Sequence, residues 1–253
     1  MKSAMKGTTP LGTRNEQEAA NWVRGMFGRV AHRYDLANHL LSLNIDRLWR
    51  ARTVRRVRHI LEQPDARVLD ICCGTGDLVL ALAGDTRHAR PVLGSDFCHP
   101  MLTAARDKVA RRGGSAVLFE ADALRLPVRD ASLDLITVAF GFRNLANYEA
   151  GLREMRRALR PGGTAAILEF SQPPNRIFAA MYNWYSREIL PIIGGALSGS
   201  RDAYRYLPES VRKFPSAAQL ASDMQRAGFE EVRYEHWTGG IVALHLGQVA
   251  KTT

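Results

Sequence analysis

The spacing of apolar residues changes near Arg67 and divides the chain into two patterns. After Arg67, short runs rich in β-branched residues alternate with stretches whose apolar positions recur at helical spacing. Strands joined by helices in this order form parallel βαβ units that are buried on both faces. The predicted strands cover 67–72, 92–97, 116–121, 133–140 and 164–170, and the helices between them cover 77–83, 99–111 and 148–159.

The last forty residues predict a different connection between strands. Ser216 and Gln219 form a capping box for a helix that ends at Gly228. Two further strands, 231–237 and 241–249, are separated by a Gly-Gly turn and therefore predict a β-hairpin. The expected fold is α/β: a doubly wound, seven-stranded, mostly parallel sheet with a C-terminal antiparallel hairpin.

Three segments lie outside this alternation. Residues 1–15 are polar and predict a disordered tail. Residues 16–62 carry two helical patterns, the second of them rich in arginine, and are expected to form a helical cap over the substrate. Residues 172–213 are an apolar and aromatic insert, and a connection this long between regular elements usually has a function. We expect a single domain over 16–253.

The turn after the first predicted strand is the first candidate site. The run Leu69-Asp70-Ile71-Cys72-Cys73-Gly74-Thr75-Gly76-Asp77 ends a strand in Gly-x-Gly and opens a helix, where backbone N–H groups can approach a ligand. The dinucleotide fingerprint requires a third Gly or Ala three residues after the second glycine, and Val79 occupies that position. A ligand without a pyrophosphate is therefore expected.

Four residues of this turn have candidate roles in binding. Gly74 and Gly76 are expected to adopt positive φ or to permit close approach of a ligand. Thr75 is placed to reach a ligand carboxylate. Asp70 either accepts hydrogen bonds within the loop or binds a ligand ammonium, and both alternatives stay open.

Acidic residues end the next two predicted strands. Asp96 follows Gly76 by twenty residues, at the position that accepts ribose hydroxyls in doubly wound folds, and its alternative role is the N-cap of the following helix. Asp122-Ala123 ends the third strand, where an adenine amino group can meet an acceptor. A lone Asp after a strand is more often a turn residue, so only its register with Asp96 favours a binding role.

Charge and cysteine content limit the partners. A formal net charge of +10 favours nucleic acid or an anionic membrane surface, with a merely solvated basic surface as an equal alternative. Cys72, Cys73 and Cys98 have neither zinc-site spacing nor an even number, so we expect no metal and a reducing compartment. No apolar run approaches the length of a membrane span.

The segment Ala139-Phe140-Gly141-Phe142-Arg143-Asn144 follows the fourth predicted strand, where methyl acceptors usually bind. It lacks the Asp/Asn-Pro-Pro-aromatic motif of enzymes that methylate nucleic-acid amines, and the chain lacks a Pro-Cys nucleophile. Both missing motifs make a nucleic-acid substrate less probable. Arg143 can bind a phenolate or polarise a water, and its alternative is a surface ion pair.

Taken together, these stretches resemble the quinone C-methyltransferases of menaquinone and ubiquinone biosynthesis, which are class I enzymes dependent on S-adenosylmethionine. The resemblance covers about Met26 to Gln248. It rests on Phe27–Asn38, Leu69–Asp77, Phe140–Asn144, Leu159-Arg160-Pro161-Gly162-Gly163, Leu168-Glu169-Phe170-Ser171 and Tyr204-Arg205-Tyr206-Leu207-Pro208.

The resemblance implies roles for individual residues. It places Thr75, Asp96 and Asp122-Ala123 at the S-adenosylmethionine positions, in the site that also contains Asp70, Gly74 and Gly76. Ala139 stands where the family commonly has Ser, so that hydroxyl contact is absent. On the acceptor side, the resemblance suggests that Arg143 and Asn144 position a water that removes the proton, and that Tyr34 lines the quinol ring.

The implied reaction is methylation of a ring carbon of a polyprenylated quinol, with demethylmenaquinol as the first choice and a polyprenyl methoxy-benzoquinol as the alternative. The non-enzymatic alternative is a basic RNA- or lipid-binding module, against which the intact Asp70, Gly74, Gly76 and Asp96 argue. The insert is expected to shelter the isoprenoid tail or to dip into a bilayer. We therefore expect a cytoplasmic protein peripheral to an anionic membrane, without nucleic acid, and able to form a homo-oligomer.

Overall fold

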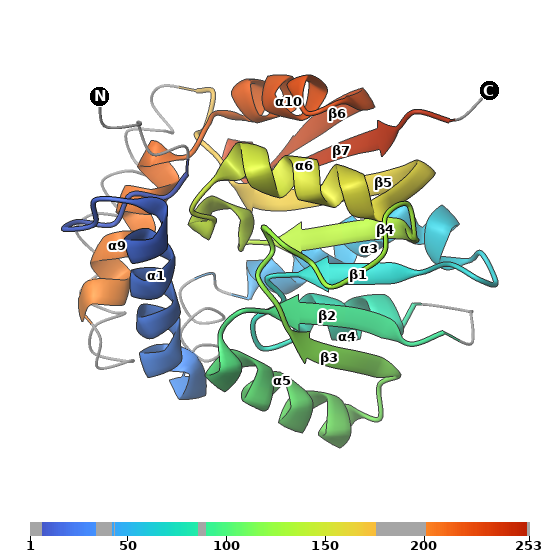
Figure 1. Ribbon diagram of the computed structural model, residues 1–253, viewed down its shortest axis with the longest axis horizontal. Coiled ribbons are helices and arrows are strands. Elements are labelled where there is room, and N and C mark those ends of the chain that lie inside the picture. Colours follow the sequence, from blue (N-terminus) through green and yellow to red (C-terminus); the bar gives the residue numbers. More distant parts are fainter. Residues whose placement is uncertain (1–6, 34–41, 43, 86–89, 176–200, 252–253) are drawn as a thin grey trace.

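The computed structural model describes residues 7–33, 42, 44–85, 90–175 and 201–251 (Figure 1). Seven strands form one sheet in the order β3-β2-β1-β4-β5-β7-β6. The strands are β1 (Val68–Ile71), β2 (Val92–Asp96), β3 (Ala116–Glu120), β4 (Leu133–Ala139), β5 (Leu159–Phe170), β6 (Phe229–Trp237) and β7 (Val242–Val249). The first five strands are parallel, and β7 runs antiparallel to both of its neighbours. The predicted fold class is confirmed.

Two strands begin earlier than predicted. β5 starts at Leu159, before the Pro-Gly-Gly run, because Leu159 pairs with Leu133 ahead of a register shift in β4. β6 starts at Phe229, and its ladder with β7 is irregular between Glu230 and Arg233. The hairpin turn lies at Thr238–Gly240, as the Gly-Gly pair predicts, since both glycines have positive φ. Turn glycines therefore identify connections more reliably than they identify strand ends.

Helices cover both faces of the sheet (Figure 1). They are α3 (Ile45–Leu61), α4 (Asp77–Ala83), α5 (His99–Arg112), α6 (Tyr148–Ala158) and α10 (Ala217–Arg226). Val68 of β1 belongs to one apolar core, which also contains Val57 of α3. Leu69 of β1 belongs to a second apolar core, which also contains Leu152 of α6. This alternation buries both faces of β1, as a central parallel strand requires. The predicted Ser216–Gln219 capping box is present at α10.

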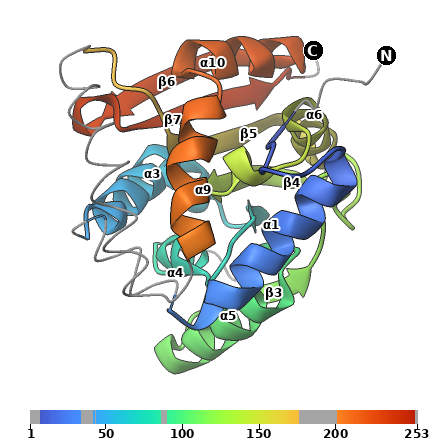
Figure 2. The ribbon, with the colours of Figure 1, turned by 90° about the vertical axis from the view of Figure 1, so that its left-hand side faces the viewer.

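Two helices lie across the carboxyl ends of the parallel strands. α1 (Glu16–Val30) and α9 (Arg201–Lys213) stand side by side there (Figures 1 and 2). Of the two helices described within the expected cap 16–62, α1 has this position and α3 does not, because α3 packs against α4, β4 and β5. Of the expected insert 172–213, residues 176–200 lie outside the described residues, and α9 forms the rest of its second half.

The segment 7–15 belongs to the stretch for which the sequence predicts a disordered tail, yet it packs on the domain. The Thr8 N–H donates to the Leu145 carbonyl at 2.8 Å, and Thr8 is only 3% exposed. A Cβ on Gly7 would lie 2.3 Å from the backbone of Ala146, so the chain passes very close there. Among the described residues, no helix is both long and apolar enough to cross a membrane.

Candidate active site

A pocket opens where β1, β2 and β4 end. α1 lies across the same ends of these strands (Figure 1). Ligands of doubly wound sheets bind in this crevice. α1 contributes Ala20 and Phe27 to the lining. Of the seven predicted cofactor residues, six line the pocket: Asp70, Gly74, Thr75, Asp96, Asp122 and Ala123. Gly76, the seventh, is the N-cap of α4.

The turn from β1 to α4 is wound in the left-handed region. Cys72, Gly74 and Gly76 have φ values of 50°, 56° and 82°. The two glycines adopt this conformation without the steric penalty that a side chain brings, as the sequence predicts. A Cβ on Gly74 would meet nothing within 4 Å, so backbone conformation rather than a clash requires glycine there. The turn thus presents bare backbone to the pocket.

Val79 of α4 faces Gly94 of β2. A Cβ on Gly94 would lie 2.8 Å from Cγ2 of Val79 and 2.6 Å from Cδ2 of Leu118. In the dinucleotide fingerprint the third glycine provides this close helix–strand contact. Here the small residue lies on the neighbouring strand, and the branched side chain lies on the helix.

Asp96 connects the turn to β2. Its Oδ2 accepts a hydrogen bond from the Gly74 N–H at 2.9 Å, and its Oδ1 accepts one from the Cys98 N–H at 2.8 Å. Asp96 is 7% exposed, and burial raises its pKa to about 6. The N-cap of α5 is Cys98 and not Asp96, so the capping alternative for Asp96 is wrong. Asp96 instead belongs to the pocket lining.

Asp70 lies beneath the turn and takes its hydrogen bond from another strand. Its Oδ1 accepts from the Thr137 hydroxyl of β4 at 2.6 Å. It is 1% exposed, and burial raises its pKa to about 7, against the opposing effects of the Thr137 bond and the Arg50 charge. A buried carboxylate of this kind gains from a cationic ligand, which offsets the cost of its desolvation.

Asp122 and Ala123 follow β3 and differ in burial. Asp122 is exposed, and its Oδ1 accepts from the Leu124 N–H at 2.9 Å, as a turn residue does. Ala123 is 6% exposed and belongs to the lining. Both alternatives for Asp122, a turn residue and a ligand contact, are compatible with this position.

Thr75 belongs to a polar network behind the turn. Lys108 Nζ of α5 donates to the Thr75 hydroxyl at 3.2 Å and to Asp77 Oδ1 at 2.8 Å. Asp77 Oδ2 lies 4.0 Å from Arg50 Nη1 of α3, and Arg50 also pairs with Asp46. Arg50 and Asp77 line the pocket.

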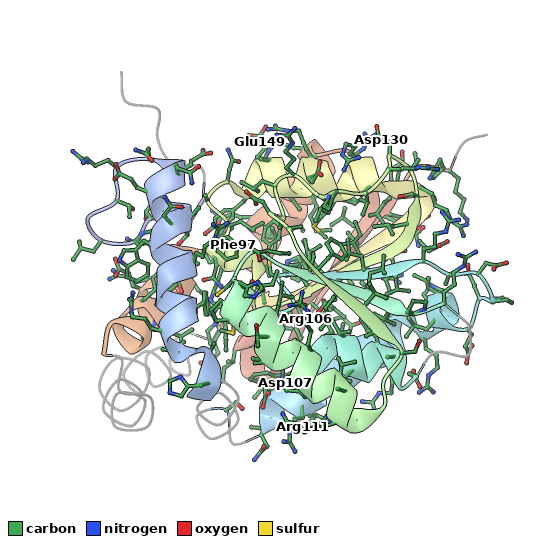
Figure 3. All side chains as sticks on the ribbon, turned by 60° about the horizontal axis from the view of Figure 1, so that its bottom comes forward. Phe97, Arg106, Asp107, Arg111, Asp130 and Glu149 are labelled. Atoms are coloured by element: carbon green, nitrogen blue, oxygen red, sulfur yellow. The ribbon has the colours of Figure 1, made fainter. Side chains whose placement is uncertain are left out.

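The part of the pocket near the end of β4, where the sequence predicts the methyl acceptor, is called the acceptor side. It is lined largely by aromatic and aliphatic side chains. Phe140 lines it, with its ring centroid 4.7 Å from that of Phe170 and 5.8 Å from that of Trp49. Phe97 stands where the sheet meets α1, whereas Arg106, Asp107 and Arg111 lie on the outer side of α5 (Figure 3). Asn144, one of the predicted acceptor residues, lines the pocket beside Leu145 and Ala146.

Arg143 is placed differently from both sequence alternatives. It is 4% exposed, so the surface ion pair is wrong, and it is not among the side chains that line the pocket. Its Nη1 lies 2.8 Å from Glu169 Oε1, and its backbone N–H donates to Glu169 Oε2 at 3.1 Å. Nη1 also donates to the Phe140 carbonyl. Arg143 therefore holds the 3-10 turn η2 (Phe142–Asn144) in place.

Tyr206 of α9 joins three segments on the acceptor side. Its hydroxyl donates to Asn144 Oδ1 at 3.0 Å and lies 2.7 Å from the Thr8 hydroxyl. Burial raises its pKa to about 12, so the phenol stays protonated. Tyr34, the third predicted acceptor residue, lies outside the described residues.

Comparison with known proteins decides the family. The model of the ubiE/COQ5 methyltransferase family matches residues 13–249. This chain belongs to that family.

The curated relatives agree. A demethylmenaquinone methyltransferase from Thermus thermophilus is 48% identical over 88% of this chain and 99% of its own length. A ubiquinone/menaquinone biosynthesis C-methyltransferase from Azotobacter vinelandii is 42% identical over 96% of each chain. Among solved structures, a SAM-dependent methyltransferase from Thermotoga maritima has a TM-score of 0.63 at 18% identity, over 89% of this chain and 99% of that one, which supports the class I methyltransferase fold.

Some residues of this family member's site were not singled out from the sequence. Arg50 was grouped with the other arginines of its helix, although it alone of them lines the pocket in the described residues. Lys108 lies in α5, and nothing in the sequence pattern of this helix indicates its contacts with Thr75 and Asp77. Glu169 and Tyr206 stand in the motifs Leu168–Ser171 and Tyr204–Pro208, so the motifs marked them without indicating their contacts.

Proposed function

We propose that this protein transfers a methyl group from S-adenosylmethionine to a ring carbon of a polyprenylated quinol, converting demethylmenaquinol to menaquinol. Two relatives, the Thermus thermophilus protein at 48% identity and one from Deinococcus radiodurans at 43%, are named demethylmenaquinone methyltransferases and support this substrate. The methyltransferase family match over residues 13–249 supports the reaction type.

The charge of the pocket carries the proposal for the methyl donor. Four aspartates and one arginine stand among the lining residues: Asp70, Asp77, Asp96, Asp122 and Arg50. S-adenosylmethionine has two cations, the sulfonium and the ammonium, and one carboxylate, so an acidic pocket with a single cation complements it. We assign the ribose hydroxyls to Asp96, the adenine amino group to Asp122-Ala123, and the ammonium to Asp70. The donor supplies a methyl group activated by the sulfonium.

The acceptor side suits a reaction in which charge disappears. A quinol ring carbon becomes nucleophilic as the neighbouring hydroxyl loses its proton, and its attack on a sulfonium methyl group cancels charge. Water stabilises the charged reactants, so a dry site favours the transition state. Phe27, Phe140 and Leu145 supply apolar lining. In the proposal Asn144 holds a water that accepts the proton, Arg143 positions Asn144 through η2, and Tyr34 lines the ring.

The test is turnover with defined substrates. Purified protein, S-adenosylmethionine and chemically reduced demethylmenaquinone should yield menaquinone by mass spectrometry, and the oxidised quinone should yield none. A reduced polyprenyl methoxy-benzoquinone, run in parallel, tests the ubiquinone alternative, which the name of the Azotobacter relative includes. Binding of S-adenosylmethionine without methylation of either quinol would overturn the proposal and favour a binding module.

We further propose that the protein works on the surface of an anionic membrane. Leu48 of α3 is 58% exposed, and Arg47 and Arg55 of the same helix are exposed as well. Exposed basic side chains and an exposed apolar one on the same helix suit the headgroup region of anionic lipid. Co-flotation with phosphatidylglycerol vesicles at low salt, and its loss at high salt or with neutral vesicles, is expected. Absence of flotation at low salt would remove this part of the proposal.

A further inference from the structure

We infer that Arg50 receives the carboxylate of the methionine part of S-adenosylmethionine. The inference rests on the proposed function and adds a binding residue that the sequence marks only as one of several arginines in the second helical pattern of residues 16–62. It replaces Thr75, which the sequence favoured for the same carboxylate.

Arg50 reaches the pocket from α3 and lies near Asp77 Oδ2, whereas Lys108 of α5 donates to Asp77 Oδ1. The side chain of Arg50 is 12% exposed, its Nη1 is 4.0 Å from Asp77 Oδ2, and its Cζ lies 5.6 Å from the centroid of Phe140. Its charge also lowers the pKa of Asp70 against the effect of burial. The guanidinium thus lies between the Gly-x-Gly turn and the aromatic acceptor side.

The surrounding charges require a cation for any carboxylate that enters. Asp70, Asp77 and Asp96 line the same part of the pocket, and like charges repel strongly where water is largely excluded. Arg50 is the cationic residue of the lining in the described part of the chain. Guanidinium has five N–H donors in a planar fork that matches a carboxylate, so the bond to Asp46 leaves donors for a ligand.

Thr75 fits this role less well. Thr75 is only 3% exposed, and its hydroxyl is held 3.2 Å from Lys108 Nζ, so it can offer a ligand at most one O–H donor. A neutral hydroxyl also offsets none of the charge of a carboxylate. Lys108 itself pairs with Asp77 and is not among the lining residues.

Arg50 is held in position before a ligand arrives. It pairs with Asp46 one helical turn earlier, and Asp46 is 4% exposed. Asp46 Oδ1 in turn accepts a hydrogen bond from the Ser42 hydroxyl at 2.6 Å. A fixed side chain loses little conformational freedom on binding, which favours affinity.

The experiment compares two ligands that differ by one group. Calorimetry measures the binding of S-adenosylmethionine and of decarboxylated S-adenosylmethionine to the wild-type protein and to Arg50→Met. We expect the variant to bind S-adenosylmethionine about 10- to 100-fold more weakly, the usual range for a hydrogen bond to a charged group. Its affinity for the decarboxylated ligand should change by less than about twofold. Arg50→Lys should recover part of the lost affinity.

Controls separate the possible failures. Arg111→Met, an exposed arginine on the outer side of α5, should bind both ligands as the wild type does. Arg50→Gln keeps a donor toward Asp46 and should show the same selective loss, which covers the case in which Arg50→Met folds poorly. Equal weakening of both ligands, or no weakening, would overturn the inference alone. A wild-type protein that binds neither ligand would overturn the proposed function.

Discussion

The guanidinium of Arg143 and the carboxylate of Glu169 form a buried ion pair, with 2.8 Å between Nη1 and Oε1 and side chains that are 5% and 1% exposed. Glu169 also accepts from the backbone N–H groups of Arg143 and Phe170. The last residues of β5 thereby fix the turn that carries Asn144 into the pocket.

Glu169→Gln should therefore lower the free energy of unfolding strongly. Removing one partner leaves the other charge buried without compensation, which costs about 3–5 kcal/mol. Urea denaturation followed by circular dichroism measures the change. The matched control is Glu149→Gln on α6, whose ion pair with Arg153 is exposed and should contribute at most about 1 kcal/mol. Similar effects at both sites would contradict the role assigned to burial.

Tyr206→Phe should affect turnover more than cofactor binding. The variant loses the hydroxyl that bonds to Asn144 and Thr8, and a buried hydrogen bond contributes about 1 kcal/mol. We expect the kcat for quinol methylation to fall severalfold with an unchanged Kd for S-adenosylmethionine. Tyr234→Phe, at a 39% exposed position on β6, is the control. An equal loss of kcat and cofactor affinity would mean that Tyr206 only supports folding.

The affinity for S-adenosylmethionine should rise with pH between about 5 and 8. In the ligand-free protein burial raises the pKa of Asp70 to about 7 and that of Asp96 to about 6. A cationic ligand prefers the ionised carboxylates, so binding at lower pH must first release protons, and the Kd at pH 5 should exceed that at pH 8 by about tenfold or more. Calorimetry in two buffers of different ionisation enthalpy measures this release. Asp70→Asn should flatten the profile, and a flat wild-type profile would count against the assignment.

The same two carboxylates should make the ligand-free protein less stable as pH rises. Their pKa values are higher in the folded than in the unfolded chain, so the folded state binds more protons between about pH 4 and pH 7. Their contribution is greatest below this window and is lost as pH rises through the folded pKa values. Thermal melts of wild type and Asp70→Asn across the window should differ in slope. Parallel slopes would mean that Asp70 titrates normally.

Gly94→Ala should destabilise the protein through overpacking. The new methyl group would meet Val79 and Leu118 at distances below 3 Å, and such strain costs about 1–3 kcal/mol. Val79→Ala in the same chain should recover part of the loss, because it vacates one of the two contacts. The free energies of unfolding of the two single variants and the double variant give the coupling. Additive effects would show that the two residues do not compete for the same space.

The sequence predicts the sheet well because its signals are local. Alternating strand and helix patterns, the Gly-x-Gly turn and the Gly-Gly hairpin depend on residues near one another in the chain. β5 begins five residues before its predicted start because pairing with Leu133, rather than propensity, decides its end. The predicted tail is packed over 7–15 because Thr8 bonds to Leu145 and Tyr206, contacts that no local pattern encodes.

Some residues of the candidate site can likewise be predicted from local sequence, and others cannot. Asp70, Thr75 and Asp96 are fixed by their distance from strand ends, so position in the chain was enough to find them. Arg50 contacts Asp77 and Glu169 contacts Arg143 across different elements, and no spacing rule connects those pairs. Residues whose role depends on a distant partner require the three-dimensional structure.

The position of β7 bears on how the chain completes its sheet. β7 follows β6 in sequence but pairs with β5 on one side and β6 on the other, so β6 reaches the sheet only through β7. During synthesis the five parallel strands leave the ribosome first, and β5 remains an open edge until residues 242–249 emerge. Such long-range pairing is slow, and an unpaired edge strand invites association with other chains. A nascent chain stalled before residue 242 should therefore require a chaperone more than the finished protein does.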